Sequence, residues 1–553
     1  AVSGNTGTGP TEAEETGGSG QTGTGDTGDT KDTGNTGDTG GTAQPDSVTV
    51  DPGSTKDNEG WGVTLFTTVQ DAVTAVAEGG TVTVKPGTYT EQIEITKNLV
   101  LRGAGASETI IKAPETVKAW EGSMPDEARY AIVYVHDAAD VQIEGITVDG
   151  QGKGDEIIGL TGIAFYNAGG SVRNSIIKSL RADSAFARQD GDGVFAQAES
   201  GKGPFTLELT GNTISDYQKN GIEVSEAVNA TILANTVKTE PTSEVAQNGI
   251  QLLYGAAGKV IGNVVTGNRY TGDGWAATGI MLYDSGTGVE VLNNEVKNTD
   301  YGISFDVQCD KMTASDNRIS DSEVGVRFDQ CTSGIAEVHN NDLSGTEVGI
   351  RNKSEGVTVN GEENWWGDKV GPTTSEVTAG SKVEGNVKYD SWLKAKPTFF
   401  DLEIDGADEI VKDTSWTYEV EFENRTAATP VHVIFEVTLK ESGIDDRDVT
   451  LKYSISGSHL TELNLDDEGS TLVGMIGLPN GYLVQPDNDI VLKLRLKFKE
   501  TGDYDLKVRA LLAENPTIEL ALDSMSIDVG KAKTSGSSGK GSHSEVSDQE
   551  SNN

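Results

Sequence analysis

Three basic side chains in the middle of the chain could act as proton acceptors: Arg188, Lys219 and Arg269. Three carboxylates from the same stretch could hold a calcium ion, which prefers several oxygen ligands: Asp190, Asp192 and Asp273. A cation held against a uronate carboxyl group acidifies the neighbouring C–H proton, and a nearby base can then remove it. These residue types therefore fit calcium-assisted β-elimination of an acidic glycan.

A second set of residues has the types that bind sugars, because aromatic rings stack on sugar faces and arginine neutralises carboxylates. The set consists of Trp120, Arg129, Tyr130, Asp155, Glu156, Tyr270 and Trp275. Polar loops at a protein surface have the same composition without any binding role. A saccharide-binding groove and ordinary solvated loops remain as two interpretations of these residues.

Two interleaved series of short motifs must position these residues. An asparagine followed two residues later by an apolar residue recurs at Asn174, Asn212, Asn235, Asn263, Asn294, Asn317, Asn341 and Asn364. A glycine followed by isoleucine or valine recurs at Gly162, Gly193, Gly221, Gly249, Gly279, Gly302, Gly325 and Gly349. Two registered series with spacings down to 23 residues indicate one supersecondary unit stacked many times.

Each repeat carries short runs with apolar residues at alternate positions, such as Gly302-Ile-Ser-Phe. Short strands can bury their apolar face only by stacking about 4.8 Å apart in a solenoid. We expect the glycines at tight corners that need a positive φ. We expect the asparagines to form a ladder of stacked side-chain amides. The sequence therefore predicts a parallel β-helix.

The extra residues of the longer repeats lie mainly between an asparagine strand and the next glycine strand. Three such loops, 178–192, 238–248 and 266–278, carry many of the candidate residues, and insertions at 114–130 and 150–160 carry others. Loops at one corner of a solenoid lie above one another. We therefore expect them to build one wall over the N-terminal half of the helix.

Two blocks of sequence resemble known β-helix proteins. Residues 66–105, with an amphipathic helix at 66–77 to cover the open end and then Pro86-Gly-Thr-Tyr-Thr-Glu91, look like the start of pectin-lyase-like right-handed β-helix proteins. Asn364-Trp-Trp-Gly-Asp-Lys-Val-Gly-Pro372 resembles a block that closes many secreted β-helix repeat proteins. The resemblance implies a right-handed fold, whose members include lyases, hydrolases, esterases, epimerases and non-catalytic adhesins.

The two cysteines, Cys309 and Cys331, lie about one repeat apart. A strand spacing of about 4.8 Å would place their Cα atoms within the ~4.4–6.8 Å that a disulfide needs. Either a disulfide between neighbouring turns or a stacked pair of thiols fits this spacing.

The chain divides by composition into four segments. Residues 1–44 are mostly Gly, Thr and Asp, which predicts a disordered tether, and they open as a mature secreted form would. Residues 45–396 carry the β-helix pattern. Residues 397–530 have longer alternating strands, which predict an antiparallel β-sandwich similar to the immunoglobulin-like domains of surface proteins. Residues 531–553 predict a second disordered tail.

A formal net charge of -44 argues against nucleic acid or an anionic membrane as a partner. No apolar run approaches the ~20 residues of a membrane span, and the catalytic blocks of pectin methylesterases and polygalacturonases are absent. We expect an all-β protein, secreted or at a cell surface, that presents a polysaccharide-binding or assembly surface in a structural or adhesive role. The alternative is a calcium-assisted polysaccharide lyase. The expected partner is a polysaccharide or cell-wall glycan, with self-association as a third alternative.

Overall fold

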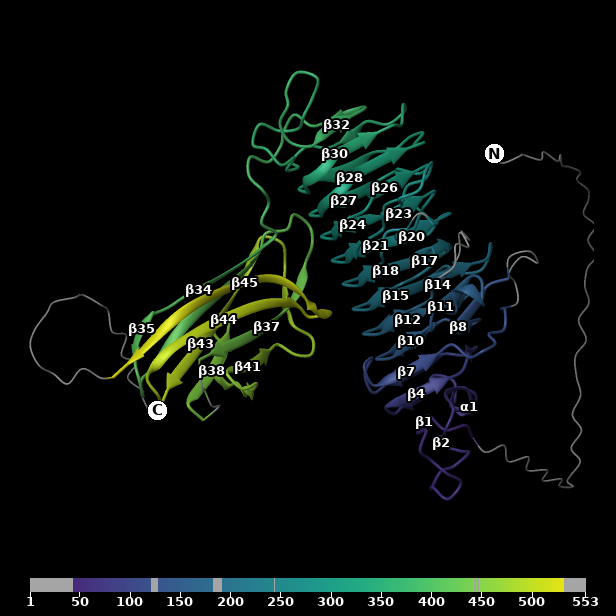
Figure 1. Cartoon of the computed structure of the whole chain (residues 1–553), viewed down its shortest axis with the longest axis horizontal. Coiled ribbons are helices and arrows are strands. Elements are labelled where there is room, and N and C mark those ends of the chain that lie inside the picture. Colours follow the sequence, from purple (N-terminus) through teal and green to yellow (C-terminus); the bar gives the residue numbers. More distant parts are fainter. Residues whose placement is uncertain are drawn as a thin grey trace, which may run out of the picture. The chain divides into compact units, whose positions relative to one another are not determined.

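The computed structural model describes residues 43–120, 128–182, 191–242, 244–441, 444 and 447–531. These residues form parallel sheets as far as Lys388 and mainly antiparallel sheets from Phe400 onward (Figure 1). The helices among the described residues are α1 (Val69–Ala75) and the 3-10 helix η1 (Lys153–Asp155). The fold is therefore all-β, with a parallel β-helix followed by a β-sandwich.

The parallel region has three strands in most of its turns, and each turn stacks on the one before it. Strands that follow each other at one face pair in parallel and in register, as Leu209 does with Ile232. The strands of the first face are β1 (Ser47–Val50), β2 (Leu65–Phe66), β3 (Thr81–Val84), β6 (Leu99–Gly103), β9 (Val141–Glu144), β12 (Gly170–Arg173), β15 (Phe205–Thr210), β18 (Val228–Leu233), β21 (Ala257–Ile261), β24 (Glu290–Leu292), β27 (Met312–Ser315), β29 (Ala336–His339), β31 (Val359–Asn360) and β33 (Val387–Lys388).

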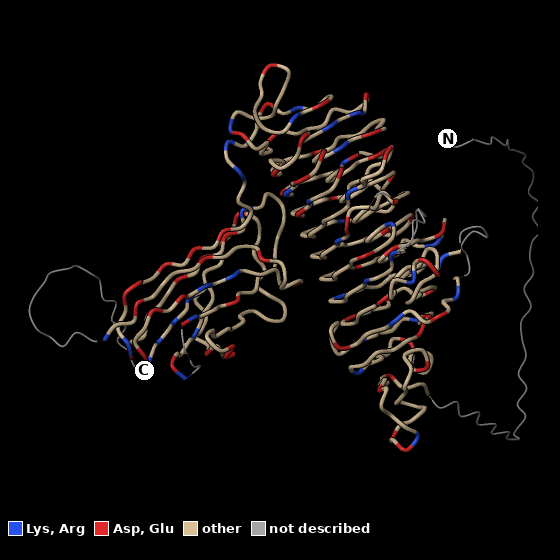
Figure 2. The backbone as a smooth tube through the Cα atoms, in the orientation of Figure 1, with Lys and Arg blue, Asp and Glu red and all other residues tan. Residues whose placement is uncertain are grey.

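The second face consists of short strands. They are β4 (Gly87–Thr90), β7 (Thr109–Lys112), β10 (Thr147–Asp149), β13 (Ile176–Lys178), β16 (Thr213–Ser215), β19 (Thr236–Lys238), β22 (Val264–Thr266) and β25 (Glu295–Lys297). Figure 2 shows charged residues along the turns of the stack.

The third face consists mostly of longer strands, and it carries the candidate site. They are β5 (Ile93–Ile95), β8 (Tyr130–His136), β11 (Leu160–Tyr166), β14 (Asp192–Ala198), β17 (Asn220–Glu226), β20 (Asn248–Leu253), β23 (Thr278–Tyr283), β26 (Tyr301–Asp306) and β32 (Lys382–Glu384). Two strands, β28 (Arg318–Asp329) and β30 (Asp342–Asn352), run through both the second and the third face.

Buried asparagines stack along the corner between the first and second faces, as the sequence predicts. The Nδ2 atom of each donates to Oδ1 of the next at 2.9–3.0 Å, through Asn212, Asn235, Asn263, Asn294, Asn317, Asn341 and Asn364. Asn174 is not part of this ladder, because it is exposed and the backbone N–H of Ser175 donates to Asn212 Oδ1 at 3.0 Å. The predicted ladder is confirmed from Asn212 onward. The expectation that Asn174 is its first member is wrong.

The glycine series has a different cause from the one expected. Gly193, Gly221 and Gly249 do not have a positive φ, so the prediction of left-handed corners is wrong. A Cβ on Gly221 would lie 2.4 Å from Cγ1 of Val237 and 2.6 Å from the carbonyl oxygen of Gly249. The chain needs glycine here because the second face and the next turn leave no room for a side chain.

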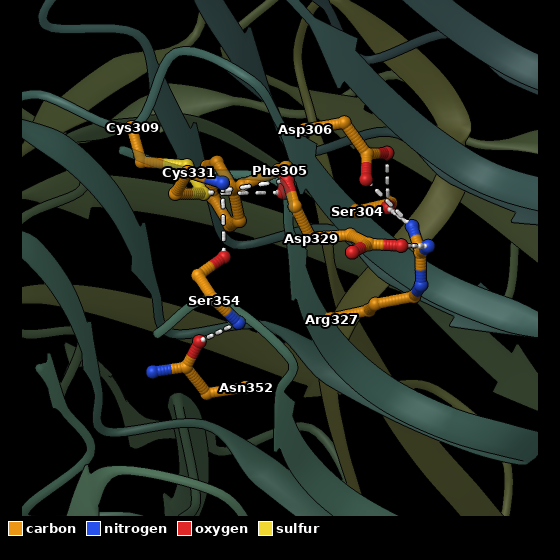
Figure 3. A network of polar contacts seen from close by, with 9 residues as sticks. All are labelled: Ser304, Phe305, Asp306, Cys309, Arg327, Asp329, Cys331, Asn352 and Ser354. Atoms are coloured by element: carbon orange, nitrogen blue, oxygen red, sulfur yellow. Dashed lines mark hydrogen bonds and ion pairs between the residues drawn. A yellow bond between two sulfur atoms is a disulfide. The ribbon is translucent and has the colours of Figure 1, made fainter. Parts of the chain in front are cut away.

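Of the two alternatives for the cysteines, the structure has the disulfide. Cys309 and Cys331 are bonded, with 5.8 Å between their Cα atoms. The bond joins successive turns in which the rings of Phe305 and Phe328 also stack, 4.8 Å apart. Figure 3 shows it near the network in which Arg327 contacts two carboxylates of the third face.

Helix α1 precedes most of the turns, and its apolar side buries Val69, Ala72 and Val73. It begins at Val69 rather than Phe66, because the Thr68 side chain caps it and Phe66 belongs to β2. The Glu91 carboxylate accepts 2.9 Å hydrogen bonds from the first N–H groups of the helix, where negative charge is favourable.

The sandwich consists of two sheets that bury alternate residues between them. The five-stranded sheet contains β34 (Phe400–Asp405), β36 (Ser415–Asn424), β43 (Asn488–Phe498), β38 (Val449–Ile455) and β39 (Thr461–Glu462). The other sheet contains β35 (Glu409–Val411), β45 (Asn515–Gly530), β44 (Gly502–Leu512), β37 (Val431–Lys440), β41 (Thr471–Ile476), β40 (Asp466–Asp467) and β42 (Tyr482–Val484).

Candidate functional site

Side chains on the outside of the third face align from strand to strand. In β14, β17 and β20 the buried residue after each glycine is Val194, Ile222 or Ile250, and it points into the core. The residue before each glycine and the second residue after it form two rows: Asp192, Asn220 and Asn248 in one, and Phe195, Glu223 and Gln251 in the other. Because the strands are about 4.8 Å apart, neighbouring members of a row can interact.

Two carboxylates are held together in these rows by one amide and one guanidinium group. Asn220 Nδ2 donates to Asp192 Oδ1 at 3.0 Å and to Glu223 Oε2 at 2.6 Å. Arg129 Nη1 lies 4.0 Å from an oxygen of each carboxylate. The Asp192 side chain is 2% exposed and that of Glu223 is 13% exposed, so the charges are largely removed from solvent.

The environment moves two pKa values toward neutrality. Burial raises the pKa of Glu223, and the negative charge of Asp192 raises it further, against the opposing effects of Arg129 and Lys219. Burial lowers the pKa of Lys219 to about 8, although the same two carboxylates oppose this shift. The Lys219 ammonium donates to the carbonyl oxygen of Ala246. An acid and an amine tuned in this way are suited to general acid–base chemistry.

An aromatic wall adjoins this polar cluster. The Trp120 ring stacks on Tyr134, with 5.3 Å between centroids, and on Phe195, with 5.8 Å. The Arg129 guanidinium lies 4.2 Å from the centre of the Phe195 ring. Trp120 is only 5% exposed, so it forms a fixed wall rather than a projecting side chain.

A groove of about 530 Å³ lies beside this wall. Its lining residues are Gln70, Gln92, Glu94, Lys118, Ala119, Trp120, Tyr134, His136, Asp137, Tyr166 and Asn167. The ring of His136 stacks on Tyr134 and contacts Glu94 at 3.0 Å and Asp137 at 2.8 Å. Burial lowers the pKa of His136, but its hydrogen bonds to Asp137 and Glu94 outweigh burial and raise it. The size is that of a ligand-binding cleft.

The structure brings together four of the residues that sequence reasoning selected. Arg129 contacts Asp192, Lys219 is close enough to Asp192 for the two charges to interact, and Trp120 packs on the ring that Arg129 covers. One of the three predicted bases and one of the three predicted metal ligands therefore share one cluster with two predicted binding residues.

Arg269 lies elsewhere, at the corner between β22 and β23. Its Nη2 atom donates to the backbone oxygens of Asp321 at 2.8 Å and Thr299 at 3.3 Å, and its Nε atom is 3.9 Å from Asp300. Arg269, Asp300 and Asp321 line a separate acidic hollow with Glu323. The structure does not bring Arg269 to the cluster around Arg129.

The other predicted residues are spread over the surface. Asp273 and Trp275 are exposed in the loop before β23, three strands from β14, or about 14 Å at ~4.8 Å per strand. That separation keeps Asp273 and Asp192 from sharing one calcium ion, whose ligands lie at about 2.3–2.6 Å. Within the described ranges, no group of three or more His, Cys, Asp or Glu side chains is arranged for a metal.

Tyr130 opens β8 and packs against the helix core, whereas Asp155 and Glu156 are exposed in and after η1. The backbone N–H of Tyr270 donates to Asp300 Oδ2 at 2.9 Å. Two further predictions, Arg188 and Asp190, lie outside the described residues.

Sequence reasoning missed residues that lie on the strands rather than in the loops. These residues are Glu94, Tyr134, His136, Tyr166, Phe195, Asn220 and Glu223. A usable signal was present, because the second residue after each glycine of the series points outward from the third face. Reading that position along the repeats would have selected Phe195 and Glu223 as neighbours.

A comparison with known protein families finds a match in the region that contains this cluster. Residues 192–364 match the family described as right handed beta helix region. This part of the chain is a right-handed β-helix. The match begins at the first strand residue of the polar cluster and ends at the last asparagine of the ladder. Among proteins with curated descriptions, none matches the chain.

Several solved structures resemble parts of the chain. The enzymatically active domain of tailspike protein 4 from bacteriophage CBA120 is 10% identical, and the match covers 82% of this chain and 64% of that one at a TM-score of 0.22. A cohesin module of a family 33 glycoside hydrolase from Clostridium perfringens is 16% identical, with 24% and 99% covered and a TM-score of 0.18. The major pilin SpaD from Corynebacterium diphtheriae is 15% identical, with 28% and 39% covered and a TM-score of 0.16. TM-scores this low say nothing about function.

The helices that the structure describes lack the length and apolar character needed to cross a bilayer.

Proposed function

We propose that this chain is a secreted or cell-surface protein that binds an acidic polysaccharide along the third face of its β-helix. The observation that carries the proposal is the groove beside Trp120, whose aromatic lining continues through Phe195 to Arg129. Aromatic rings offer apolar faces to sugars, and arginine offers paired donors to a carboxylate. The disulfide and the net charge of -44 support an extracellular location.

Arg129 is the residue best suited to select an acidic sugar. Its Nη1 atom is buried and makes no hydrogen bond to a described residue, although it lies 4.0 Å from two carboxylates. A ligand carboxylate could accept from this guanidinium at normal hydrogen-bond distance. Lys118 supplies a positive charge to the groove lining, which also contains Glu94 and Asp137.

Retention on immobilised polysaccharides tests the binding proposal, with acidic and neutral glycans compared in parallel. Tyr166→Ala removes a ring that lines the groove, and Tyr283→Ala is its matched control, since both tyrosines occupy the same outward row of the third face. We expect Tyr166→Ala to weaken binding at least ~10-fold, or ~1.4 kcal/mol, and Tyr283→Ala to bind as the wild type does. Equal affinities for the two variants, or no retention of the wild type on any glycan, would sink the proposal.

A second candidate function is cleavage of the bound glycan by β-elimination, favoured by the shifted pKa values of Lys219 and Glu223. The unprotonated Lys219 amine takes the proton next to the uronate carboxyl group. The electron pair of that C–H bond forms a carbon–carbon double bond, and the glycosidic C–O bond breaks. Protonated Glu223 donates a proton to the departing oxygen, and Arg129 balances the charge that develops on the carboxylate.

Calcium belongs to this second candidate, with Asp192 as the residue of the cluster that could bind it. Ultraviolet absorbance of unsaturated product, measured with calcium and with a chelator, tests the reaction and the metal separately. We expect Lys219→Met to abolish the product, while Lys238→Met, an exposed lysine of β19, leaves the rate unchanged. Product formation by Lys219→Met at the wild-type rate would exclude Lys219 as the base.

A further inference from the structure

The five-stranded sheet of the sandwich has an outer face that is open to solvent. Alternate residues of its strands, such as Tyr418, Val420 and Leu494, point inward and are fully buried. The residues between them, such as Glu421 and Arg495, are exposed. This face carries charge of both signs, and the two signs are segregated.

One half of the face, formed by β34 and β36, is acidic. Six carboxylates face outward there in three directly opposed pairs: Asp401 with Glu423, Glu403 with Glu421, and Asp405 with Glu419. Like charges directly opposite each other destabilise an antiparallel pair of strands. An isolated sheet would be more stable with the two signs mixed.

The other half, formed by β43 and β38, is basic. Its outward side chains include Lys493, Arg495 and Lys497, and Lys452 stands directly opposite Arg495 on one side and Glu462 of β39 on the other. One carboxylate, Asp489, lies at the start of β43, directly opposite Glu423 of the acidic half. A basic stripe is unusual in a chain with a net charge of -44. In Figure 2 the acidic residues, drawn in red, follow one another along strands of the sandwich.

Only some of these charges have a partner among the described residues. Lys493 lies 2.5 Å from Glu419 across the boundary between the halves, and Arg425 contacts Asp401 and Glu423. Within the described residues the other charges of the face make no ion pair: Glu403, Asp405, Glu421, Lys452, Arg495 and Lys497. Both halves therefore keep charge for a partner of opposite sign.

We propose that this face binds the same face of a second copy of the chain. A two-fold axis that lies in the plane between the two facing sheets, parallel to the strands and above the boundary between β36 and β43, places the acidic half of each copy on the basic half of the other. Such an isologous contact needs one self-complementary surface, which the charge segregation provides. Val491 lies near that axis, between the acidic and basic residues, and supplies an apolar contact.

The size of the face sets the strength of the association. Four strands at ~4.8 Å and about seven residues at ~3.4 Å give roughly 450 Å² per copy. The total of roughly 900 Å² lies below the ~1,200–2,000 Å² of stable interfaces. We therefore expect a weak, reversible dimer that depends on electrostatic attraction.

Sedimentation of the full-length chain at ~0.01 M and ~1 M salt tests this dependence, because the Debye length falls from ~30 Å to ~3 Å between them. We expect dimers at low salt and monomers at high salt. A wild type that is monomeric at low salt, or a dimer that survives high salt unchanged, overturns the proposal.

Charge-reversed variants locate the contact. Glu403→Lys with Glu421→Lys reverses two of the six carboxylates of the acidic half, and Arg495→Glu with Lys497→Glu reverses two of the four basic residues of the basic half. Each variant alone should remain monomeric, whereas an equimolar mixture should form heterodimers. Lys238→Glu with Lys297→Glu, on the second face of the β-helix, is the matched control and should dimerise as the wild type does.

Circular dichroism of each variant establishes that the sandwich is folded. Should a double variant fail this control, Glu421→Lys and Arg495→Glu alone give the same comparison. Dimers that persist in both variants place the contact elsewhere, and a folded pair that does not associate on mixing refutes the two-fold arrangement.

Discussion

Neighbouring carboxylates occur on the outer faces of both regions, but their surroundings differ. On the β-helix, Asp192 and Glu223 are largely buried, and Asn220 and Arg129 lie against both. On the sandwich, Glu403 and Glu421 are exposed, stand directly opposite each other and make no ion pair with a described residue.

The difference follows from the cost of removing charge from water. A largely buried carboxylate needs a partner within the chain or a proton, since its desolvation costs several kcal/mol. An exposed one is screened by solvent and salt, so it can remain uncompensated until another molecule approaches. The β-helix cluster therefore has its own counter-charge and is preorganised. The sandwich face instead has charged side chains that lack an ion-pair partner among the described residues.

The comparison is most strongly tested by removing a cation from each face. Arg129→Ala leaves the carboxylates of Asp192 and Glu223 without their guanidinium, and we expect the free energy of unfolding to fall by ~3 kcal/mol. Lys493→Ala removes the partner of exposed Glu419, and we expect a loss below ~0.5 kcal/mol. Urea unfolding, followed for the transition of the mutated region, measures both values.

Equal losses for the two variants would contradict the distinction between the faces. A small loss for Arg129→Ala would mean that the remaining partners, Asn220 and Lys219 among them, are enough to hold the two carboxylates. In that case Arg129 would be free to act only on a ligand, and its effect should appear in polysaccharide retention instead.

Much of the fold could be predicted from the sequence because the packing repeats. The asparagine ladder can be recognised in the sequence because each step needs the same side-chain amide, as from Asn235 to Asn263. The glycines are visible for the same reason, but sequence does not distinguish a corner that needs positive φ from a strand position without room for a Cβ. Gly221 is of the second kind.

The candidate site was harder to predict because it does not repeat. Lengths of loops indicated the half of the β-helix that contains the candidate site and selected Trp120 and Arg129, yet they also selected Trp275, which is 74% exposed. Glu223 lies in a regular strand, and only the register with β14 places it beside Asp192. Which loop side chain crosses several strands to reach such a pair depends on three-dimensional packing.

A pH series gives the second test of the comparison, with Glu223→Gln. The raised pKa of Glu223 makes the folded protein hold its proton more tightly than the unfolded chain does. Wild-type stability therefore decreases as pH rises from the unfolded value of ~4.3 through the raised folded value. Glutamine keeps an acceptor for Asn220 but cannot ionise, so the variant should gain at least ~1.4 kcal/mol over the wild type across this window.

Glu421→Gln is the matched control on the sandwich. We expect its stability to stay within ~0.5 kcal/mol of the wild type throughout the same pH series. Thermal unfolding at each pH measures both variants. A difference between Glu223→Gln and wild type that does not grow with pH would show that the Glu223 carboxyl is not shifted.

The smallest effect is expected from Glu421→Lys, and its sign is what matters. The new lysine stands directly opposite Glu403, so a repulsive pair becomes an attractive one and stability should rise by ~0.2–1 kcal/mol. The same change replaces one negative charge of the acidic half of the sandwich face by a positive one and should weaken dimerisation at low salt. A fold that gains stability while its assembly weakens would show that the charges are segregated for association. A loss of stability with dimerisation unchanged would show that the acidic pairs serve the sandwich itself.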